Sequence, residues 1–280
     1  MLLIIKLGGS VITDKKKYMT ADKRNIARLA KEIAEARKKS RFDLVIVHGA
    51  GSFGHMPAKR HGIHKGVYSE KQRLGFADTN YSCSVLSQHV VSALLKEKIP
   101  AIVVSPLTVL DHSDKRMKKF NTEIISTLLK AGYVPVMRGD VVLDDVIGGS
   151  ISSGDEQVPY LARALHANKI IYGVDVDGIF TADPKTNKKA KLIPLITSEN
   201  ISNVLSSLEE AKTCDVTGGM RGKIKELLQN AFVPTYIVNA RKPGYFREMI
   251  LGENVTHTKI ILNDSINRFC DTGARNNILT

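Results

Sequence analysis

Three glycine-rich segments give this 280-residue chain its clearest chemical signal. They are residues 6–10 (KLGGS), 48–55 (HGAGSFGH) and 213–223 (TCDVTGGMRGK). Glycines leave backbone N–H groups accessible to an anion, and the start of a helix adds the positive end of its dipole. Lys6 and Lys223 add full positive charges to two of these segments. Because three such loops can hold several phosphate groups at once, they indicate phosphoryl transfer, which needs a donor and an acceptor together.

Residues 49–54 also match the G-x-G-x-x-G pattern of dinucleotide-binding proteins, with an acidic residue, Glu70, roughly twenty residues further on. In that class of protein the acid ends a second apolar strand, whereas residues 61–69 are polar and show no strand pattern. A nicotinamide or flavin site is therefore disfavoured. The Walker A pattern and the protein-kinase motifs H-R-D and D-F-G are absent from the sequence, so a kinase would belong to another lineage.

The chain is basic: 41 Lys and Arg residues against 28 Asp and Glu give a formal net charge of +13 at pH 7. This balance favours anionic partners such as nucleotides and phosphorylated metabolites, although a lysine-rich solvated surface explains it equally well. The basic runs at 15–17, 37–41 and 115–119 are short, dispersed and not interleaved with aromatic residues. A nucleic-acid partner is therefore not expected.

The three cysteines, Cys83, Cys214 and Cys270, lie far apart, with no C-x-x-C pair and no cysteine–histidine cluster that could bind a metal. Unpaired cysteines are typical of a reducing compartment. The N-terminus lacks the features of a signal peptide, and no apolar run approaches the roughly 18 residues of a membrane span. We expect a cytoplasmic protein with no stable membrane association.

Short apolar segments rich in Ile and Val alternate with helical patterns along most of the chain. The predicted strands are residues 2–7, 43–47, 101–105, 134–137, 169–174, 235–238 and 259–262. Nearly continuous apolar runs are typical of buried parallel strands. We therefore predict an α/β fold, a three-layer αβα sandwich around a mostly parallel sheet, with glycine loops at the carboxyl ends of its strands.

The first helix is predicted over residues 21–39, with Thr20 as its N-cap and Asp22 in its first turn. Further helices are predicted at residues 70–97, 121–131, 156–167, 198–211 and 222–231. The remaining segments are predicted to be a hairpin at 140–151, a polar surface loop at 183–192 and a polar C-terminal tail at 263–280.

Four motifs together resemble the amino acid kinase family. They are KLGGS at 6–10, SGD at 153–155, DVDGIFTADP at 175–184 and GGMRGK at 218–223. Within that family the chain is most similar to the isopentenyl phosphate kinases of archaeal type, through ITDK at 12–15, HGAGSFGH at 48–55, GDVV at 139–142 and DVTGGM at 215–220. The resemblance runs from residue 2 to residue 262, and its most distinctive residue is His55.

The resemblance implies one amino acid kinase domain over residues 1–262, with an acceptor lobe at 1–168 and a nucleotide lobe at 169–262. It implies that phosphate passes from ATP, with Mg²⁺, to a small-molecule prenyl phosphate. The expected acceptor is isopentenyl phosphate, which would give isopentenyl diphosphate and ADP for isoprenoid biosynthesis. The resemblance also implies a homodimer.

Roles for single residues follow from the same resemblance. The expected nucleotide-binding residues are Lys6, Leu7, Gly8, Gly9, Ser10, Gly51, Asp175, Phe180, Gly219 and Lys223. The expected acceptor-binding residues are Ala50, His55 and Gly154. The expected catalytic residues are Lys6, Lys15, His55 and Asp155, of which Asp155 would orient the lysines. No residue is assigned as a metal ligand.

The charges of the two substrates agree with such a set. ATP and a phosphate monoester bring roughly five to six negative charges together, so several cations and N–H groups must converge on them. A phosphate monoester is mostly dianionic at pH 7, because its second pKa is about 6. It therefore needs no general base, and we expect His55 to donate a hydrogen bond and position the acceptor.

Some of these residues also have structural explanations. Asp155 could cap the helix that follows it, His48 is expected to be a satisfied structural group, and Asp177 and Asp183 suit turns. The other histidines are expected at the surface: His61, His64, His89, His112, His166 and His257. Candidates to line an apolar pocket for a prenyl tail are Phe76, Tyr81, Cys83, Leu86, Val90, Ile147 and Ile151.

Two other functions stay open. One is another small-molecule kinase of the same fold, acting on fosfomycin, uridylate or an amino acid. The other is a catalytically silent nucleotide-binding sensor. Such a sensor is expected to have lost some of the charged site residues, and all of them are present: Lys6, Lys15, His55, Asp155 and Lys223.

Overall fold

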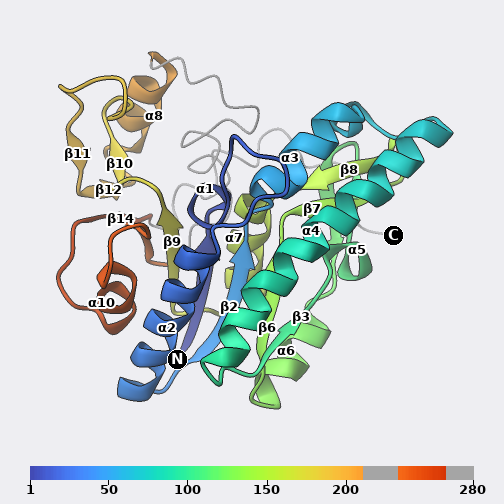
Figure 1. The fold of residues 1–280 in the computed structure, drawn as a ribbon. Helices are drawn as coiled ribbons and strands as arrows, with labels where there is room; N and C mark the ends of the chain where they lie inside the picture. Colours follow the sequence, from blue (N-terminus) through green and yellow to red (C-terminus); the bar gives the residue numbers. More distant parts are fainter. Residues whose placement is uncertain (211–232, 263–280) are drawn as a thin grey trace, which may run out of the picture.

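The computed structural model describes residues 1–210 and 233–262, which are built around an eight-stranded sheet with the order β12-β14-β13-β9-β1-β2-β6-β3 (Figure 1). Its strands are β1 (Leu2–Leu7), β2 (Asp43–His48), β3 (Ala101–Val103), β6 (Val134–Arg138), β9 (Lys169–Val174), β12 (Leu195–Thr197), β13 (Thr235–Asn239) and β14 (His257–Ile261). Every neighbouring pair is parallel except β13 and β14. The predicted mostly parallel sheet is confirmed, and all seven predicted strands belong to it.

The sheet divides into two halves by sequence. β1, β2, β3 and β6 come from the first 168 residues, whereas β9, β12, β13 and β14 follow residue 168. β1 and β9 lie side by side at the centre and pair in parallel from Leu3 with Lys169 to Leu7 with Gly173. The carboxyl ends of the two central strands therefore meet at one edge of the sheet.

Helices cover both faces of this sheet, as predicted for three layers. One face packs against α2 (Lys23–Lys39), α4 (Glu70–Lys96) and α10 (Tyr245–Leu251), and the other against α6 (Glu123–Lys130), α7 (Gly154–Ala164) and α8 (Ile201–Glu210). β1 shows the alternation most clearly, because Leu3, Ile5 and Leu7 join the first core and Ile4 joins the second. The same alternation points Lys6 towards the face that carries α7.

Local sequence fixes where the two long helices begin. Asp22 is the N-cap of α2, and its carboxylate accepts a hydrogen bond from the Asn25 N–H at 3.0 Å. The prediction of Thr20 as the cap is therefore wrong, and both residues are of the capping type, so sequence alone could not separate them. α4 begins with a capping box in which Ser69 and Gln72 each satisfy the other's backbone N–H group.

A second sheet has the order β5-β4-β7-β8. Its predicted part, the hairpin at 140–151, is confirmed as β7 (Asp140–Asp144) and β8 (Gly148–Ser152), which pair antiparallel. The other part, β4 (Leu110–Ser113) and β5 (Arg116–Phe120), was not predicted, because its exposed positions carry the basic run at 115–119 and hide any apolar alternation. The sequence did not predict the short antiparallel pair β10 (Ile179–Phe180) and β11 (Leu192–Ile193) either.

Other elements sit between these strands. They are α1 (Gly9–Ile12), α3 (Gly51–Arg60), the 3₁₀ turn η1 (Ile63–Lys65) and α5 (Pro106–Val109). The predicted helix at 222–231 and the predicted tail at 263–280 lie outside the described residues. None of the helices within residues 1–210 and 233–262 combines the length and the apolar character that a membrane crossing requires.

Two histidines are fully buried. His48, as predicted, is structural: its Nδ1 donates to the Gly49 carbonyl at 3.1 Å, and its Nε2 accepts from the Ser87 hydroxyl at 2.9 Å, which ties the end of β2 to α4. His112 was predicted at the surface, and that prediction is wrong. It is 1% exposed, with Nδ1 2.8 Å from the Ser150 hydroxyl and Nε2 3.3 Å from the Glu156 carboxylate.

Burial makes the fold sensitive to acid through His48. Desolvation, opposed by the bond to Gly49 and helped by the charge of Arg138, lowers the pKa of His48 to about 4 from the model-peptide value of 6.5. Between pH 6.5 and pH 4 the unfolded chain takes up a proton that the folded chain refuses, so stability falls as pH falls through this window. At about 1.4 kcal/mol per pKa unit, His48 accounts for a loss of about 3 kcal/mol.

We therefore expect His48→Gln to flatten the pH dependence of the free energy of unfolding between pH 6.5 and pH 4, measured by urea denaturation. The matched control is His166→Gln, which changes an exposed histidine. Equal slopes for wild type and His48→Gln would contradict the assignment.

Candidate active site

Two glycine loops touch each other at the carboxyl ends of β1 and β2. A Cβ on Gly9 would lie 2.7 Å from the Gly51 nitrogen, and a Cβ on Gly49 would lie 2.6 Å from the Gly9 nitrogen. Real Cβ atoms do not approach a backbone nitrogen so closely, so only glycine fits at these positions. The glycines thus allow the two loops to pack backbone against backbone.

Three helices begin near these loops: α1 at Gly9, α3 at Gly51 and α7 at Gly154. The first N–H groups of a helix have no partner within it, and they carry the positive end of the dipole. Ser153 is the N-cap of α7 and its hydroxyl accepts from the Glu156 N–H at 3.2 Å. The alternative that Asp155 caps this helix is therefore wrong, since its carboxylate bonds a different group.

That group is the ammonium of Lys6. The Lys6 Nζ lies 2.5 Å from the Asp155 carboxylate, and the two side chains are 4% and 16% exposed. The same Nζ lies 5.6 Å from the centre of the Tyr172 ring. β1 turns the Lys6 side chain towards α7, whereas Leu7 turns into the core on the other face of the sheet. The Lys6–Asp155 ion pair therefore lies at the start of α7, next to the glycine loop that follows β1.

A small cradle of backbone N–H groups lies beside this pair. A Cβ on Gly139 would lie 3.4 Å from the Gly154 nitrogen and 3.7 Å from the Ala50 nitrogen, and a Cβ on Gly154 would lie 3.4 Å from Cε of Lys6. Neither the Ala50 N–H nor the Gly154 N–H has a hydrogen-bond partner among the described residues. The Ala50 and Gly154 nitrogens thus lie next to Gly139, and the Lys6 side chain lies next to Gly154, an arrangement suited to a small anion.

His55 lies one turn further along α3. It is exposed and is four residues from Gly51, so the two lie on the same face of the helix. The structure thus places His55 on the helix whose start borders the cradle.

A second group of charges surrounds Asp175, which follows β9. The Ser10 hydroxyl donates to its carboxylate at 3.0 Å, and the Lys185 ammonium lies 2.5 Å from its other oxygen. Partial burial alone would raise the pKa of Asp175. The bonds from Lys185 and Ser10, with the charges of Lys185 and Lys15, outweigh burial and hold the pKa below its ordinary value. Lys15 is exposed, and its charge acts on this carboxylate.

Two basic residues of this region were missed at the level of sequence. Lys185 lies in the segment predicted as a polar loop, where its N–H donates to Asp183 at 2.9 Å, so Asp183 forms the predicted turn. Arg241 follows β13 and donates to the Ser10 carbonyl at 2.5 Å. A basic residue directly after a predicted strand was the available signal for Arg241, whereas Lys185 meets Asp175 only through the fold.

The other predicted nucleotide-binding residues are dispersed. Gly8 donates its N–H to the Gly173 carbonyl at 2.9 Å, and Phe180 is half-buried in β10. The Asp177 carboxylate accepts a hydrogen bond from Asn239 at 2.9 Å and pairs with Lys242, so it ties the segment after β9 to the end of β13 and the loop that follows. Gly219 and Lys223 lie outside the described residues.

The candidates for a prenyl-tail pocket separate by burial. Leu86 and Val90 are buried in the core of α2 and α4. Cys83 is also buried, but its sulfur faces Gly54 of α3, where a Cβ would lie 3.1 Å from it. Tyr81 is 64% exposed. Phe76 packs in a separate small cluster formed by Ala58, Ile63, Val67 and Val141, beside α3. That cluster includes Ala58 of α3, the helix that carries His55.

No group of three or more His, Cys, Asp or Glu side chains in residues 1–210 and 233–262 could hold a metal ion. Mg²⁺ does not require such a protein cage, because it keeps several waters and binds mostly through substrate phosphates. The described residues are thus compatible with a metal that arrives on a nucleotide.

Comparison with known proteins gives a consistent result. A profile of the amino acid kinase family matches residues 1–239. Isopentenyl phosphate kinase from Methanothermobacter thermautotrophicus is 40% identical over 92% of this chain and 98% of its own, and the one from Methanocaldococcus jannaschii is 34% identical over 90% and 96%. A structure titled "X-ray structures of isopentenyl phosphate kinase" superposes with a TM-score of 0.81 at 37% identity, over 93% of this chain and 100% of that one. With these matches and the fold described above, the chain belongs to the amino acid kinase family.

Proposed function

We propose that this protein transfers the terminal phosphoryl group of ATP to isopentenyl phosphate and releases isopentenyl diphosphate and ADP. The observation that carries the proposal is the cradle of the Ala50 and Gly154 N–H groups beside the buried ammonium of Lys6. It suits a phosphate on the acceptor side, since it offers N–H donors and a positive charge without a general base. The matches to isopentenyl phosphate kinases over nearly the whole chain support the same acceptor.

The division of the sheet supports separate places for the two substrates. In the proposal, residues 1–168 hold the acceptor through Ala50, His55 and Gly154, and residues 169–262 hold ATP. On the donor side, Gly8, Gly9, Ser10 and Gly51 would line the phosphates, while Leu7 contributes only backbone because its side chain is buried.

The remaining nucleotide-binding residues of the proposal come from the second half of the chain. They are Asp175, Phe180, Gly219 and Lys223. Asp175 would act from its place beside Ser10 and Lys185. Mg²⁺ would arrive with ATP and neutralise charge on the donor phosphates.

Charge explains how the residues would act. Lys6 contacts the start of α7 beside Gly154, and its strand leads directly into the Ser10 loop, so it would neutralise the group in transfer, with Asp155 holding its ammonium in place. The exposed side chain of Lys15, whose charge acts on Asp175, would supply a second positive charge. His55 would donate a hydrogen bond to the acceptor phosphate, which is already a dianion and attacks without losing a proton. The homodimer and the cytoplasmic location stay predictions.

Turnover on a panel of acceptors tests the proposal. With Mg-ATP we expect ADP release with isopentenyl phosphate and dimethylallyl phosphate, and none with fosfomycin, uridylate or glutamate. Geranyl phosphate measures the size limit of the tail pocket. Turnover confined to fosfomycin, uridylate or glutamate would contradict the acceptor, and ATP binding without any turnover would contradict the kinase activity itself.

A second prediction concerns the charged pair. Asp155→Asn keeps the shape of the side chain but removes the charge that orients Lys6, so we expect kcat to fall about a hundredfold, the loss typical of a misplaced catalytic group. Glu156→Gln is the matched control, because it removes one carboxylate from the same helical turn and keeps an acceptor for Ser152. Steady-state kinetics of both variants measure the change in kcat, and their melting temperatures show whether each variant is folded. An equal loss of kcat in Asp155→Asn and Glu156→Gln would show that the effect comes only from removing a negative charge near the α7 dipole.

A third prediction concerns Gly139. Its backbone conformation is open to any residue, and a Cβ there would meet its neighbours at ordinary contact distances of 3.4 Å or more, so Gly139→Ala should fold. The methyl group would stand in front of the Ala50 and Gly154 N–H groups. We therefore expect the KM for isopentenyl phosphate to rise at least tenfold, with the KM for ATP changed less than twofold. An unchanged acceptor KM in a folded variant would place the acceptor elsewhere.

A further inference from the structure

Two residues from the second half of the sheet hold Ser10. Its hydroxyl donates to the Asp175 carboxylate at 3.0 Å, and its carbonyl accepts from Nη2 of Arg241 at 2.5 Å. Asp175 follows β9 and Arg241 follows β13; β13 pairs in parallel with β9, and β9 with β1. The loop that we propose for the donor phosphates is therefore held by a carboxylate at its hydroxyl and by a guanidinium at its carbonyl.

The Arg241 guanidinium makes a second contact with the first half of the chain. Its Nη1 lies 3.4 Å from the carboxylate of Asp22, the N-cap of α2. The backbone here is fixed, because the Arg241 N–H donates to the Asn239 side chain at 2.9 Å and the Ala240 N–H donates to the Val174 carbonyl at 2.8 Å. A guanidinium carries several donors in one rigid plane, so a single side chain can join a carbonyl to a carboxylate.

The two points that Arg241 joins are the ends of one loop, residues 10–22. The loop turns back on itself, since the Asp22 N–H donates to the Ile12 carbonyl at 2.8 Å. Lys15 lies within it and is exposed. Arg241 therefore closes the base of the loop that carries Lys15, which supplies the second positive charge in the proposed mechanism.

The turn after β13 is attached to α2 by bonds other than those of Arg241. Asn25 is buried, and its side-chain amide donates to the Val11 carbonyl at 2.8 Å and to the Ala240 carbonyl at 3.4 Å. Arg28 also donates to the Ala240 carbonyl. The Arg241 side chain is 43% exposed, and exposed ion pairs add little to stability. Its two contacts are therefore better explained by the geometry of the loop than by the stability of the fold.

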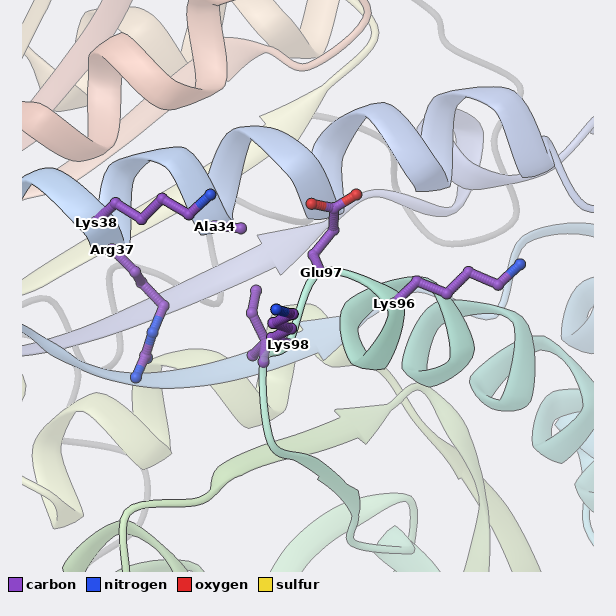
Figure 2. A pocket seen from close by; sticks show the side chains of 7 residues that line it. Ala34, Arg37, Lys38, Lys96, Glu97 and Lys98 are labelled. Atoms are coloured by element: carbon purple, nitrogen blue, oxygen red, sulfur yellow. The ribbon is translucent and has the colours of Figure 1, made fainter.

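The basic residues at the other end of α2 have a different explanation. A pocket of about 340 Å³ lies there, between the ends of α2 and α4 (Figure 2). Arg37 and Lys96 line it from the last turns of these helices, where positive charge stabilises the helix dipoles. α2 has 17 residues, so this end lies about 25 Å from Asp22. The charge of the pocket is therefore screened from the Ser10 loop, whereas Arg241 contacts that loop directly.

We propose that Arg241 is a positioning residue for the donor side of the site. It holds the Ser10 loop and the base of the Lys15 loop in the arrangement that ATP binding and transfer require. The proposal rests on the proposed kinase function. A misplacement of about 1 Å in a site of this kind is enough to slow the reaction strongly. The acceptor residues of the proposed function belong to α3 and α7, so the effect should fall on the nucleotide.

The test compares Arg241→Gln and Arg241→Lys with the full-length wild type. We expect kcat/KM for ATP to fall at least tenfold in Arg241→Gln, with the KM for isopentenyl phosphate changed less than twofold. Arg241→Lys keeps the charge and should recover part of the loss. The melting temperature should fall by no more than about 4 °C, because an exposed pair contributes little. Arg247→Gln is the matched control, since Arg247 also pairs with α2, through Glu35 at 3.0 Å.

Calorimetry with Mg²⁺ and the non-hydrolysable analogue AMP-PNP separates this proposal from the proposed function. We expect the Kd of the analogue to rise at least fivefold in Arg241→Gln, and that result supports the positioning role whether or not an acceptor is turned over. A wild type that binds AMP-PNP without any turnover contradicts the kinase activity alone.

Three results would overturn the role of Arg241. The first is a Kd for AMP-PNP and a kcat in Arg241→Gln that both equal those of the wild type. The second is an equal loss in Arg247→Gln, which would show that any tie between this segment and α2 has the same effect. The third is a melting temperature lowered by much more than about 4 °C in both Arg241 variants, which would assign the residue to the stability of the fold.

Discussion

The parallel pairing of β1 with β2 is the constraint on which the site depends. Neighbouring strands of a sheet lie about 4.8 Å apart, so the loops that leave their carboxyl ends must pass each other at backbone distance. Gly9, Gly49 and Gly51 meet that requirement, because a Cβ at any of them would collide with its neighbour. The same contact turns the N–H groups at the starts of α1 and α3 to one edge of the sheet. The anion-binding role that we propose for this edge therefore follows from how the strands pair.

The Lys6–Asp155 ion pair fixes the position of a charge and does not by itself stabilise the fold. Removing both side chains from water is costly, and a buried ion pair is weak evidence for stability. Lys6 is held by an alternation of β1 that cannot slip without exposing Leu3, Ile5 and Leu7, and Asp155 is held in the first turn of α7. The ion pair thus joins β1, a central strand of the sheet, to α7, a helix of the layer that packs on that face.

Much of the fold could be predicted from the sequence, and the reasons are specific. Buried parallel strands such as 43–48 and 169–174 are apolar throughout, so their signal survives without any knowledge of their neighbours. The sequence did not predict β4 and β5, because their polar residues are typical of a hairpin whose strands are largely exposed.

In the site, the glycine-rich turns at the carboxyl ends of β1 and β2 could be predicted because their sequence signal is local, whereas the roles of Lys6 and Lys15 stay predictions and Lys223 lies outside the described residues. The burial of His112, the bond from Lys185 to Asp175 and the cap at Asp22 could not be predicted. Each depends on which of several similar residues the tertiary structure brings into reach. His112, for example, becomes buried because β4 pairs with β7 and β7 pairs with β8, which brings its ring to the Ser150 hydroxyl of β8.

Gly139 shows how distant parts of the chain fix one point of the cradle. The residues on either side of it, Arg138 and Asp140, are both buried and pair at 2.6 Å. Asn80 of α4 donates to the same carboxylate at 3.0 Å, and Gln157 of α7 donates to the Arg138 carbonyl at 2.9 Å. α4, β6 and α7 therefore all hold the backbone at this residue. Because that backbone cannot move away, the space in front of the Ala50 and Gly154 N–H groups keeps its shape whether or not an anion is bound.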